Sequence, residues 1–352
     1  MSNVDHSEPR SETVKVDPST PDHGVLVRAG AILRSGGLVA FPTETVYGLG
    51  ANALDASAIE AVFRAKGRPA TDPLIVHIAS LEQAESLTTQ WTPGAVALAE
   101  AFWPGPLTLV LPKSPTIGDS ITAGRPTVAL RVPSHPVAHL LIEAADVPIA
   151  APSANRFGRI SPTTAAHVED ELAGSYELLL DGGATTIGVE SSVVDLSTGR
   201  PVLLRPGGIT LEALRQIVPE IEFVERTARA EEVAADAPGQ FLRHYSPRTS
   251  LVLVDGGDTL VDELCASLKD EGVQISVLDL SEEPDVAARE LYSRLRIADS
   301  SGATLILAPV YADSGIGRAV NDRLFRAAHG RIAADSMKST VTDLARLSAE
   351  PG

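Results

Sequence analysis

Short apolar runs alternate with helix-forming stretches along this chain, and the alternation limits the folds that the chain can adopt. In residues 24–212 the runs that predict strands are Leu38–Phe41, Leu74–Ile78, Leu107–Leu111, Thr127–Val132, Val147–Ala151, Leu178–Asp181, Ser192–Leu196 and Val202–Arg205. The stretches that predict helices are Val25–Arg34, Ala56–Ala65, Pro93–Ala101 and His135–Ala144. Helices and strands alternate at first and strands then follow one another, which predicts an α/β fold with a twisted mixed sheet and helices packed on it.

A second α/β unit is expected over residues 248–352. Its predicted elements follow the order βαβαβα, and one more helix closes the chain: Leu251–Val254, Leu260–Glu271, Gln274–Leu278, Val286–Ala298, Ala303–Leu307, Gly317–Ala328 and Ser339–Leu347. This order predicts a small, doubly wound, Rossmann-like domain with a parallel sheet. No GxGxxG motif follows its first strand, so the sequence assigns no dinucleotide to it.

Two segments lie outside these units. Residues 1–23 are polar and lack the basic-then-apolar pattern of a secretory signal, so we expect a short disordered leader. Residues 213–247 form a linker that ends in PGQFLRHYSP. A plain tether favours glycine, serine and charge, whereas this one carries His244 and Tyr245. The end of the linker is therefore expected to dock on another surface.

Composition excludes several classes of function. The net charge of −17 argues against broad nucleic-acid binding, which needs a basic surface, but leaves room for a local basic pocket. Cys265 is the only cysteine, so the chain has no internal disulfide and no multi-cysteine zinc site, and a reducing cytoplasm is expected. No HExxH, GxSxG or Walker P-loop occurs, and no metal site is predicted. No apolar run approaches the roughly 18 residues of a membrane span, so no membrane partner is expected.

Two stretches combine turn-forming proline and glycine with polar and charged residues: AFPTETVYGLG (40–50) and KGRPATDPL (66–74). The first follows a predicted strand, where α/β proteins place ligands, and it offers the hydroxyl of Thr45; a helix N-cap is the alternative interpretation. The second holds Lys66 and Arg68 on a fixed backbone, which suits phosphate; a solvated basic turn is the alternative.

Further polar residues lie in or beside apolar strands. His77 interrupts the apolar run Leu74–Ile78. It is either a core residue whose hydrogen bonds are satisfied or a residue that binds a ligand. Arg131 lies in a strand, where a buried arginine is rare unless paired, and it suits an amino-acid carboxylate. The motifs APSAN, SPT, GVESS and LLRPGG add serine, asparagine and arginine. This inventory suits binding and charge stabilisation rather than covalent catalysis.

Read in order, FPTETVYGLG, KGRP, DPLIVHI, WPGPLTLVL, TVALRVP, APSAN, SPT, GVESS and LLRPGG resemble the motifs of the threonylcarbamoyl-AMP synthase family. The chain is similar to the longer Sua5 type, with a YrdC-like catalytic domain, a linker like PGQFLRHYSP and a C-terminal domain. The resemblance implies a nucleotidyltransferase that makes threonylcarbamoyl-AMP and pyrophosphate from L-threonine, bicarbonate or CO₂, and ATP. The product would pass to the tRNA threonylcarbamoyl transferase complex, which forms N6-threonylcarbamoyladenosine at position 37 of tRNAs reading ANN codons. A weak affinity for RNA is a further implication.

Position by position, the resemblance implies a threonine pocket made of Thr45, His77, Arg131, Ala151 and Ser191. It implies ATP contacts by Arg68, Asp72, Thr127, Ser153, Asn155, Ser161, Arg205, His244 and Tyr245. Lys66 and Arg68 are the implied catalytic residues facing phosphate, with Mg²⁺ bound through the phosphates. Asp72 departs from the family pattern, because other members can carry Asn there. A carboxylate at that place would repel phosphate unless it met Mg²⁺ or a ribose hydroxyl.

Two other functions compete with this interpretation. A double-stranded RNA-binding module without catalysis is the main alternative, and the charge of −17 counts against it. A carbamoyl-transfer domain of the kind found in hydrogenase-maturation proteins is the other. Those proteins carry acylphosphatase and zinc-finger-like parts, which this chain lacks.

Overall fold

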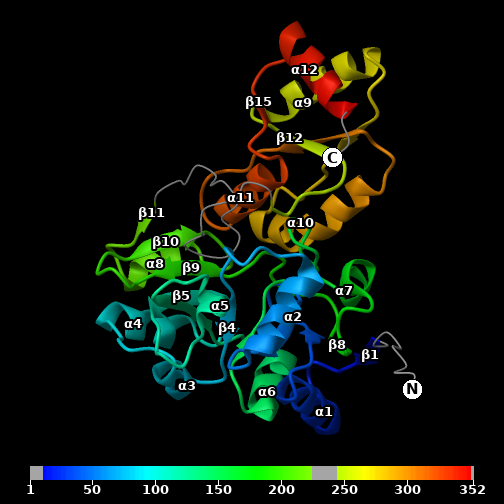
Figure 1. The fold of residues 1–352 in the computed structure, drawn as a ribbon. Helices are drawn as coiled ribbons and strands as arrows, with labels where there is room; N and C mark the ends of the chain where they lie inside the picture. The colour runs from blue at the N-terminus through cyan, green and yellow to red at the C-terminus, as the bar shows by residue number, and fades with distance from the viewer. Residues whose placement is uncertain (1–10, 224–243, 350–352) are drawn as a thin grey trace, which may run out of the picture.

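The computed structural model describes residues 11–223 and 244–349, which form two α/β units (Figure 1). Within the described residues the larger unit holds a mixed sheet of 11 strands in the order β1-β8-β2-β3-β7-β4-β6-β5-β9-β10-β11. The strands are β1 (Glu12–Lys15), β2 (Val39–Phe41), β3 (Gly48–Asn52), β4 (Ile75–His77), β5 (Leu107–Pro112), β6 (Thr127–Arg131), β7 (Ile149–Ala150), β8 (Leu178–Asp181), β9 (Ser192–Asp195), β10 (Val202–Arg205) and β11 (Glu222–Phe223). Parallel and antiparallel pairs mix along it, which confirms the predicted architecture.

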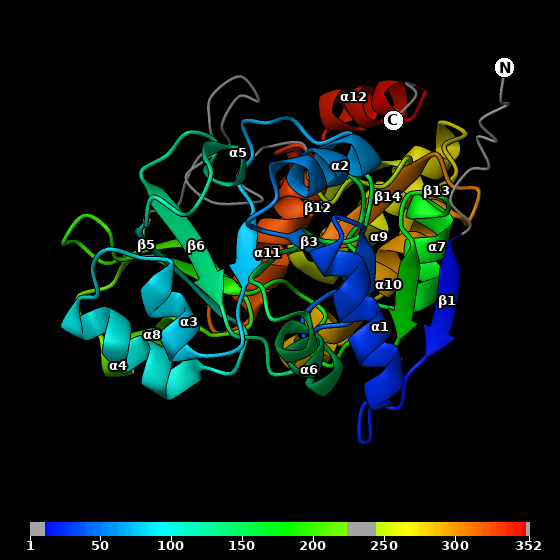
Figure 2. The ribbon, with the colours of Figure 1, turned by 60° about the horizontal axis from the view of Figure 1, so that its bottom comes forward.

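Helices cover both faces of this sheet (Figure 2). They are α1 (His23–Arg34), α2 (Ala56–Lys66), α3 (Leu81–Ser86), α4 (Pro93–Phe102), α5 (Asp119–Thr122), α6 (Pro136–Ala145), α7 (Ala165–Leu172) and α8 (Leu211–Ile217). Strand β2 shows why two faces are needed: Val39 and Phe41 pack with α1 and α6, whereas Leu38 and Ala40 pack with α2 and α7. Successive side chains of a strand point to opposite faces, and here both faces are apolar and buried.

The expected boundaries of the first unit need two corrections. Residues 1–10 lie outside the described residues, but residues 12–15 of the expected disordered leader form β1, which pairs in parallel with β8. Hydrogen bonds to the edge of β8 stabilise this strand. Its four residues are mostly polar, so no hydrophobic pattern predicts it. At the other end, the expected boundary at 212 falls inside α8, and β11 extends the sheet to Phe223.

The second unit holds a four-stranded sheet, in the order β13-β14-β12-β15, within the described range 244–349. Its elements are β12 (Ser250–Val254), α9 (Gly257–Asp270), β13 (Ile275–Val277), α10 (Pro284–Asp299), β14 (Leu305–Pro309), α11 (Gly317–Ala327), β15 (Ile332–Ala333) and α12 (Lys338–Ser348). Every strand pair is parallel, which confirms the doubly wound prediction. The two-residue β15 was not predicted.

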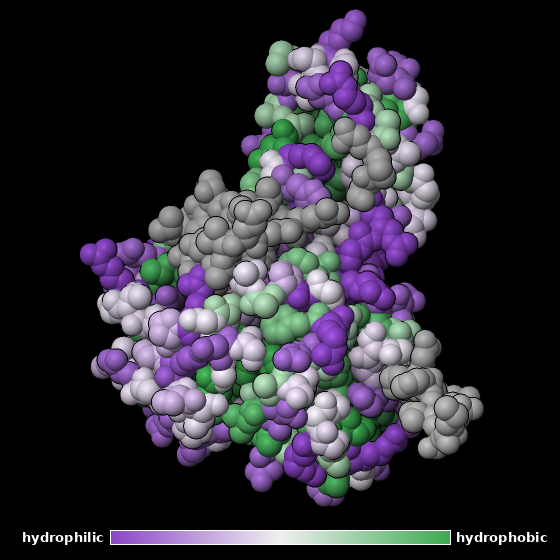
Figure 3. All heavy atoms as spheres, in the orientation of Figure 1, coloured by the Kyte–Doolittle hydropathy of each residue, from purple (hydrophilic) through white to green (hydrophobic). Residues whose placement is uncertain are grey.

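Helices α10 and α11 bring the second unit against the first (Figure 1). One buried apolar cluster contains Val46 and Val189 of the first unit, Tyr245 of the linker, and Leu291 and Leu324 of the second. On the face drawn in Figure 3, hydrophilic residues cover the outer side of α10, opposite this cluster. Among the helices of the described residues, none is long and apolar enough to span a membrane.

Candidate active site

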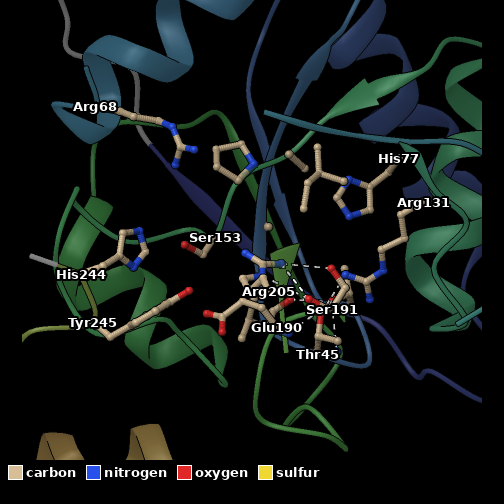
Figure 4. Close-up of a pocket in the computed structure, with 16 residues that line it drawn as sticks. Thr45, Arg68, His77, Arg131, Ser153, Glu190, Ser191, Arg205, His244 and Tyr245 are labelled. Carbon is tan, nitrogen blue, oxygen red and sulfur yellow. Dashed lines mark hydrogen bonds between the residues drawn. The ribbon is translucent and has the colours of Figure 1, made fainter. Parts of the chain in front are cut away.

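One pocket gathers most of the polar residues that the sequence singles out (Figure 4). It encloses about 540 Å³, its open mouth included. The predicted site residues that line it are Thr45, Arg68, His77, Arg131, Ala151, Ser153, Ser191, Arg205, His244 and Tyr245. Figure 4 shows His77 and Arg131 at one end, and Arg68, His244 and Tyr245 at the other. Ser191 and Arg205 lie between them, and the carboxylate of Glu190 points from the middle towards Tyr245 at the second end. The two ends are called here the threonine end and the nucleotide end, after the ligands expected there.

The threonine end rests on a pair of neighbouring strands. His77 of β4 and Arg131 of β6 are register partners in a parallel pair, so their side chains lie side by side. The Arg131 guanidinium donates to the hydroxyl of Thr45 over 3.0 Å and to the carbonyl of Gly105 over 3.3 Å. It also forms an ion pair with Glu44 at 2.8 Å. The strands thus place a cation, and the loop after β2 places a hydroxyl beside it.

Glu44 belongs to this end, although the resemblance did not assign it. Its carboxylate is buried, and burial by itself opposes ionisation. Burial is the largest single influence, but the charge and hydrogen bond of Arg131 and backbone hydrogen bonds together outweigh it and keep the pKa of Glu44 below its ordinary value. The hydroxyl of Thr43 lies 2.8 Å from that of Thr45 and donates to the carbonyl of Val46, which fixes the loop. The Thr-Glu-Thr motif therefore supports a buried arginine and does not cap a helix.

His77 is a neutral group at this end. Burial, and then the neighbouring Arg131, lower the pKa of His77 to about 3. The ring meets that of Phe41 edge to face, with 6.3 Å between the centroids. A neutral imidazole beside a cation offers hydrogen-bonding atoms without adding charge.

Ser191 and Arg205 occupy the middle of the pocket. The Arg205 guanidinium donates to the carbonyl of Ser191 from Nε over 3.1 Å and from Nη2 over 3.0 Å. The hydroxyl of Ser191 lies 2.8 Å from that of Thr108 on β5. These contacts join the residue before β9 to β10 and β5 and fix a second cation about midway along the pocket.

Arg68 marks the nucleotide end. Gly67 ends α2 in the left-handed conformation, with φ of 62°, and so turns the chain towards the pocket. The Arg68 guanidinium donates to the carbonyls of Asp72 and Pro73 and forms an ion pair with the Asp72 carboxylate at 3.0 Å. Asp72 is fully buried and does not line the pocket. The unusual carboxylate is thus neutralised by Arg68.

Lys66 takes a different place from the one expected. Its Nζ donates to the carbonyls of Ser153 and Asn155, and Lys66 is not among the residues that line the pocket. Burial, and then Arg68, hold the pKa of Lys66 well below its ordinary value. The Asn155 amide donates to the carbonyls of Arg156 and Arg159. Both side chains therefore hold the loop after β7 from behind, instead of facing the pocket as expected for phosphate contacts.

Two more expected ATP residues lie outside the pocket lining. Thr127, at the start of β6, lines a smaller hollow together with Pro73, Arg125 and Ala129. Ser161 donates its hydroxyl to Glu190 over 2.7 Å. Glu190 lines the pocket and was missed, although it stands in the quoted GVESS motif. The sequence motif does not reveal which side chains stabilise the charge of Glu190.

The linker residues His244 and Tyr245 close the nucleotide end. Their rings meet edge to face with 4.1 Å between centroids, and both are buried. Burial, and then Arg68 and Lys66, hold the pKa of His244 well below its ordinary value, so the ring is neutral. Burial, and then Glu190, raise the pKa of Tyr245 to about 12. Its hydroxyl keeps its proton and has no hydrogen-bond partner among the described residues.

Known proteins match both units. Residues 31–207 match the family model Sua5_yciO_yrdC, described as "Telomere recombination", and residues 209–329 match Sua5_C, described as "Threonylcarbamoyl-AMP synthase, C-terminal domain". The Threonylcarbamoyl-AMP synthase of Pyrococcus abyssi is 46% identical over 319 residues, 86% of this chain and 94% of the relative. That of Bacillus subtilis is 41% identical over 325 residues, 87% and 94% of the two chains. The crystal structure of P. abyssi Sua5 complexed with L-threonine has 44% identity and a TM-score of 0.88, covering 92% of this chain and 99% of the other.

Proposed function

This chain belongs to the threonylcarbamoyl-AMP synthase family, and we propose that its pocket joins L-threonine, bicarbonate or CO₂, and ATP into threonylcarbamoyl-AMP and pyrophosphate. One observation carries the proposal. A single pocket has a threonine end with Arg131 and Thr45 and a nucleotide end with Arg68, and Arg205 lies between the two ends. Three guanidinium groups in an otherwise acidic protein suit two anionic substrates that must react with each other.

The threonine end fits an amino acid. Arg131 has five N–H groups, and the contacts to Thr45, Glu44 and Gly105 use three of them. One N–H remains on each terminal nitrogen, a pair that suits the two oxygens of a carboxylate. The neutral ring of His77 adds no positive charge that would repel the amine of the substrate. Ala151 and Ser191 leave room for a small, hydroxyl-bearing side chain.

The reaction needs alignment more than it needs a nucleophilic side chain. The amine of threonine takes up CO₂ to form a carbamate, and a carbamate oxygen attacks the α-phosphorus of ATP while pyrophosphate leaves. Arg205 and Arg68 would offset the repulsion between the carbamate and the phosphates. His244 and Tyr245 cover the nucleotide end and would keep water from the mixed anhydride.

Mg²⁺ would reach the pocket with the phosphates of ATP. The carboxylates near the pocket, Glu44, Asp72 and Glu190, are each paired with an arginine. In the part of the chain that the structure describes, no cluster of three His, Cys, Asp or Glu side chains offers a metal cage. Phosphate oxygens suit Mg²⁺ and are the ligands that we assign to it.

The test is pyrophosphate release that depends on every substrate. We expect release from the purified full chain with ATP and Mg²⁺ only when both L-threonine and bicarbonate are present. L-Serine, which lacks one methyl group, serves as the matched control for the threonine end. Release at the same rate without threonine would refute the proposal.

The wider role of the product follows from its chemistry. A threonylcarbamoyl adenylate is an activated acyl donor, and we propose that the tRNA threonylcarbamoyl transferase complex consumes it at adenosine 37, in the cytoplasm. The double-stranded RNA-binding alternative is not favoured, because the arginines of the pocket are buried and the chain carries a charge of −17. Weak RNA affinity stays a prediction, to be checked by titration with tRNA.

A further inference from the structure

Glu190 connects the pocket to the C-terminal unit. Its carboxylate accepts hydrogen bonds from the hydroxyl of Tyr292 on α10, with 2.9 and 2.8 Å to its two oxygens. It also accepts from Nε of Arg323 on α11, over 2.8 Å. With the bond from Ser161, three side chains from three segments converge on one buried carboxylate. This is more than an incidental contact, because each oxygen has a dedicated donor.

The same two residues of the C-terminal unit also hold Tyr245. The ring of Tyr292 stacks on that of Tyr245, with 5.7 Å between centroids. The guanidinium of Arg323 lies 5.3 Å from the centroid of the Tyr245 ring. Tyr245 has φ of 61°, a left-handed conformation that costs free energy in a residue with a bulky side chain. The contacts of its ring with Tyr292 and Arg323 help to offset this cost.

Arg323 is placed to set the charge of the pocket wall. Its side chain is fully buried, and Nη1 donates to the carbonyl of Pro206, directly after Arg205. Glu190 lines the nucleotide end, so an unpaired carboxylate there would repel the phosphates of ATP. Paired with Arg323, it presents hydrogen-bonding atoms without a net negative charge. Gly188 reinforces the geometry, because a Cβ at that position would lie 2.4 Å from the backbone of Arg289 in α10.

We infer that Arg323 and Tyr292 of the C-terminal unit are positioning residues of the active site, which hold Glu190 and Tyr245 in the wall of the nucleotide end. The C-terminal unit then completes the ATP site and is more than a tethered accessory. The inference rests on the proposed function, since it concerns the ATP half of that reaction. It assigns nothing to the threonine end, which Arg323 and Tyr292 do not touch.

Other contacts between the units provide matched controls. Arg318, also on α11, forms an ion pair with Glu212 of α8 at 3.2 Å, and neither residue lines the pocket. Arg289 of α10 donates to the carbonyl of Thr186. Loss of Arg318 removes an arginine of α11 and a bridge between the units while it leaves Glu190 and Tyr245 untouched. It separates a general loosening of the interface from a specific effect on ATP.

The experiment compares Arg323→Met with Arg318→Met in the full chain. Pyrophosphate release gives the KM for ATP, and calorimetric titration gives the affinity for L-threonine. We expect Arg323→Met to raise the KM for ATP at least tenfold and to leave the threonine affinity within twofold of wild type. Arg318→Met should change both values less than twofold. Adding Glu190→Gln to Arg323→Met should lower the raised KM for ATP at least threefold, because it removes the unpaired charge.

The outcomes separate the two hypotheses. An active wild-type enzyme whose KM for ATP is unchanged by Arg323→Met overturns the inference and leaves the proposed function intact. Equal losses in Arg318→Met and Arg323→Met, or an equal loss of threonine affinity, also overturn it, because they indicate a structural role only. If Arg323→Met does not fold, Tyr292→Phe decides. It keeps the stacked ring and loses one donor to Glu190, so the KM for ATP should rise two- to fivefold, and an unchanged KM overturns the inference.

Discussion

The two ends of the pocket are built in different ways. The threonine end comes from one unit, where Arg131 on a central strand meets Glu44 and Thr45 on the loop after β2. The nucleotide end needs the loop after α2, the linker residue Tyr245 and, through Glu190, helices α10 and α11. At the threonine end the cation is already held by Glu44 and Thr45, whereas the Tyr245 hydroxyl at the other end has no partner among the described residues.

This difference teaches where each end is vulnerable. A site made within one sheet inherits the rigidity of its strands, and its weak point is the buried ion pair that supports it. A site assembled from separate segments depends on how the segments pack, and its weak points are remote from the ligand. Substitutions at the threonine end should therefore cost stability and threonine affinity together, while those at the nucleotide end should act on ATP alone.

The largest effect is expected from Arg131→Met. The substitution removes the guanidinium that would bind the carboxylate of threonine. It also leaves Glu44 as an unpaired buried charge, which costs on the order of 3–5 kcal/mol of stability. We expect kcat/KM for threonine to fall at least 100-fold and the melting temperature to fall with it. Urea unfolding and pyrophosphate release measure the two effects. The double variant with Glu44→Gln should regain stability but not threonine affinity, and recovery of both would contradict the assigned role of Arg131.

The next effect is the pH dependence that His77 gives to the threonine end. Its pKa is about 3 in the folded chain and close to the ordinary value of about 6.5 once the chain unfolds. Protons therefore bind the unfolded chain first as the pH falls below about 6.5, and folding stability declines until the pH approaches the folded pKa. Between pH 7 and pH 5 this single group should remove about 2 kcal/mol.

The His77→Gln variant isolates this contribution. Its stability should fall less than that of the wild-type chain over the same pH interval, as measured by urea unfolding at pH 7, 6 and 5. His244 at the nucleotide end has a pKa shift in the same direction and remains in the variant as an internal reference. Identical pH dependence in both proteins would show that His77 is not buried in its neutral form.

A smaller effect is expected from Tyr245→Phe at the nucleotide end. The variant keeps the ring that stacks on Tyr292 and loses only the unpaired hydroxyl. One neutral hydrogen bond to the nucleotide is worth about 1 kcal/mol, so the KM for ATP should rise about fivefold. Threonine affinity and melting temperature should not change. A fall in threonine affinity would break the separation between the two ends.

The smallest effect is expected from Asp72→Asn. The carboxylate that neutralises Arg68 would become an amide, and Arg68 would present more of its charge to the phosphates. The KM for ATP should fall about twofold in initial-rate measurements, with the threonine affinity constant. A rise in the KM would show that Asp72 holds Arg68 in place more than it weakens its charge.

The sequence by itself determined the two units and most of the pocket. Apolar runs that alternate with helical stretches reflect local preferences for strand and helix, and every predicted strand is present in the two sheets. Strands β1, β3, β11 and β15 were not predicted. Motifs rich in proline and glycine fix their own backbone, so Thr45, Arg68, Ser153 and Arg205 stand together in the pocket as their motifs suggested. Local chemistry was sufficient there, because each of these residues lies at or just after a strand or helix end that the pattern reveals.

Only the tertiary structure decided which charges are paired. Nothing in the sequence links Glu190 to Arg323, 133 residues away, or shows that Lys66 bonds to the carbonyls of Ser153 and Asn155 and not to a ligand. The four-residue β1 needed the edge of β8 to exist. The physical reason is common to all three: a buried polar group takes the partner that packing brings within about 3 Å, and that distance depends on the whole fold and not on the neighbouring residues.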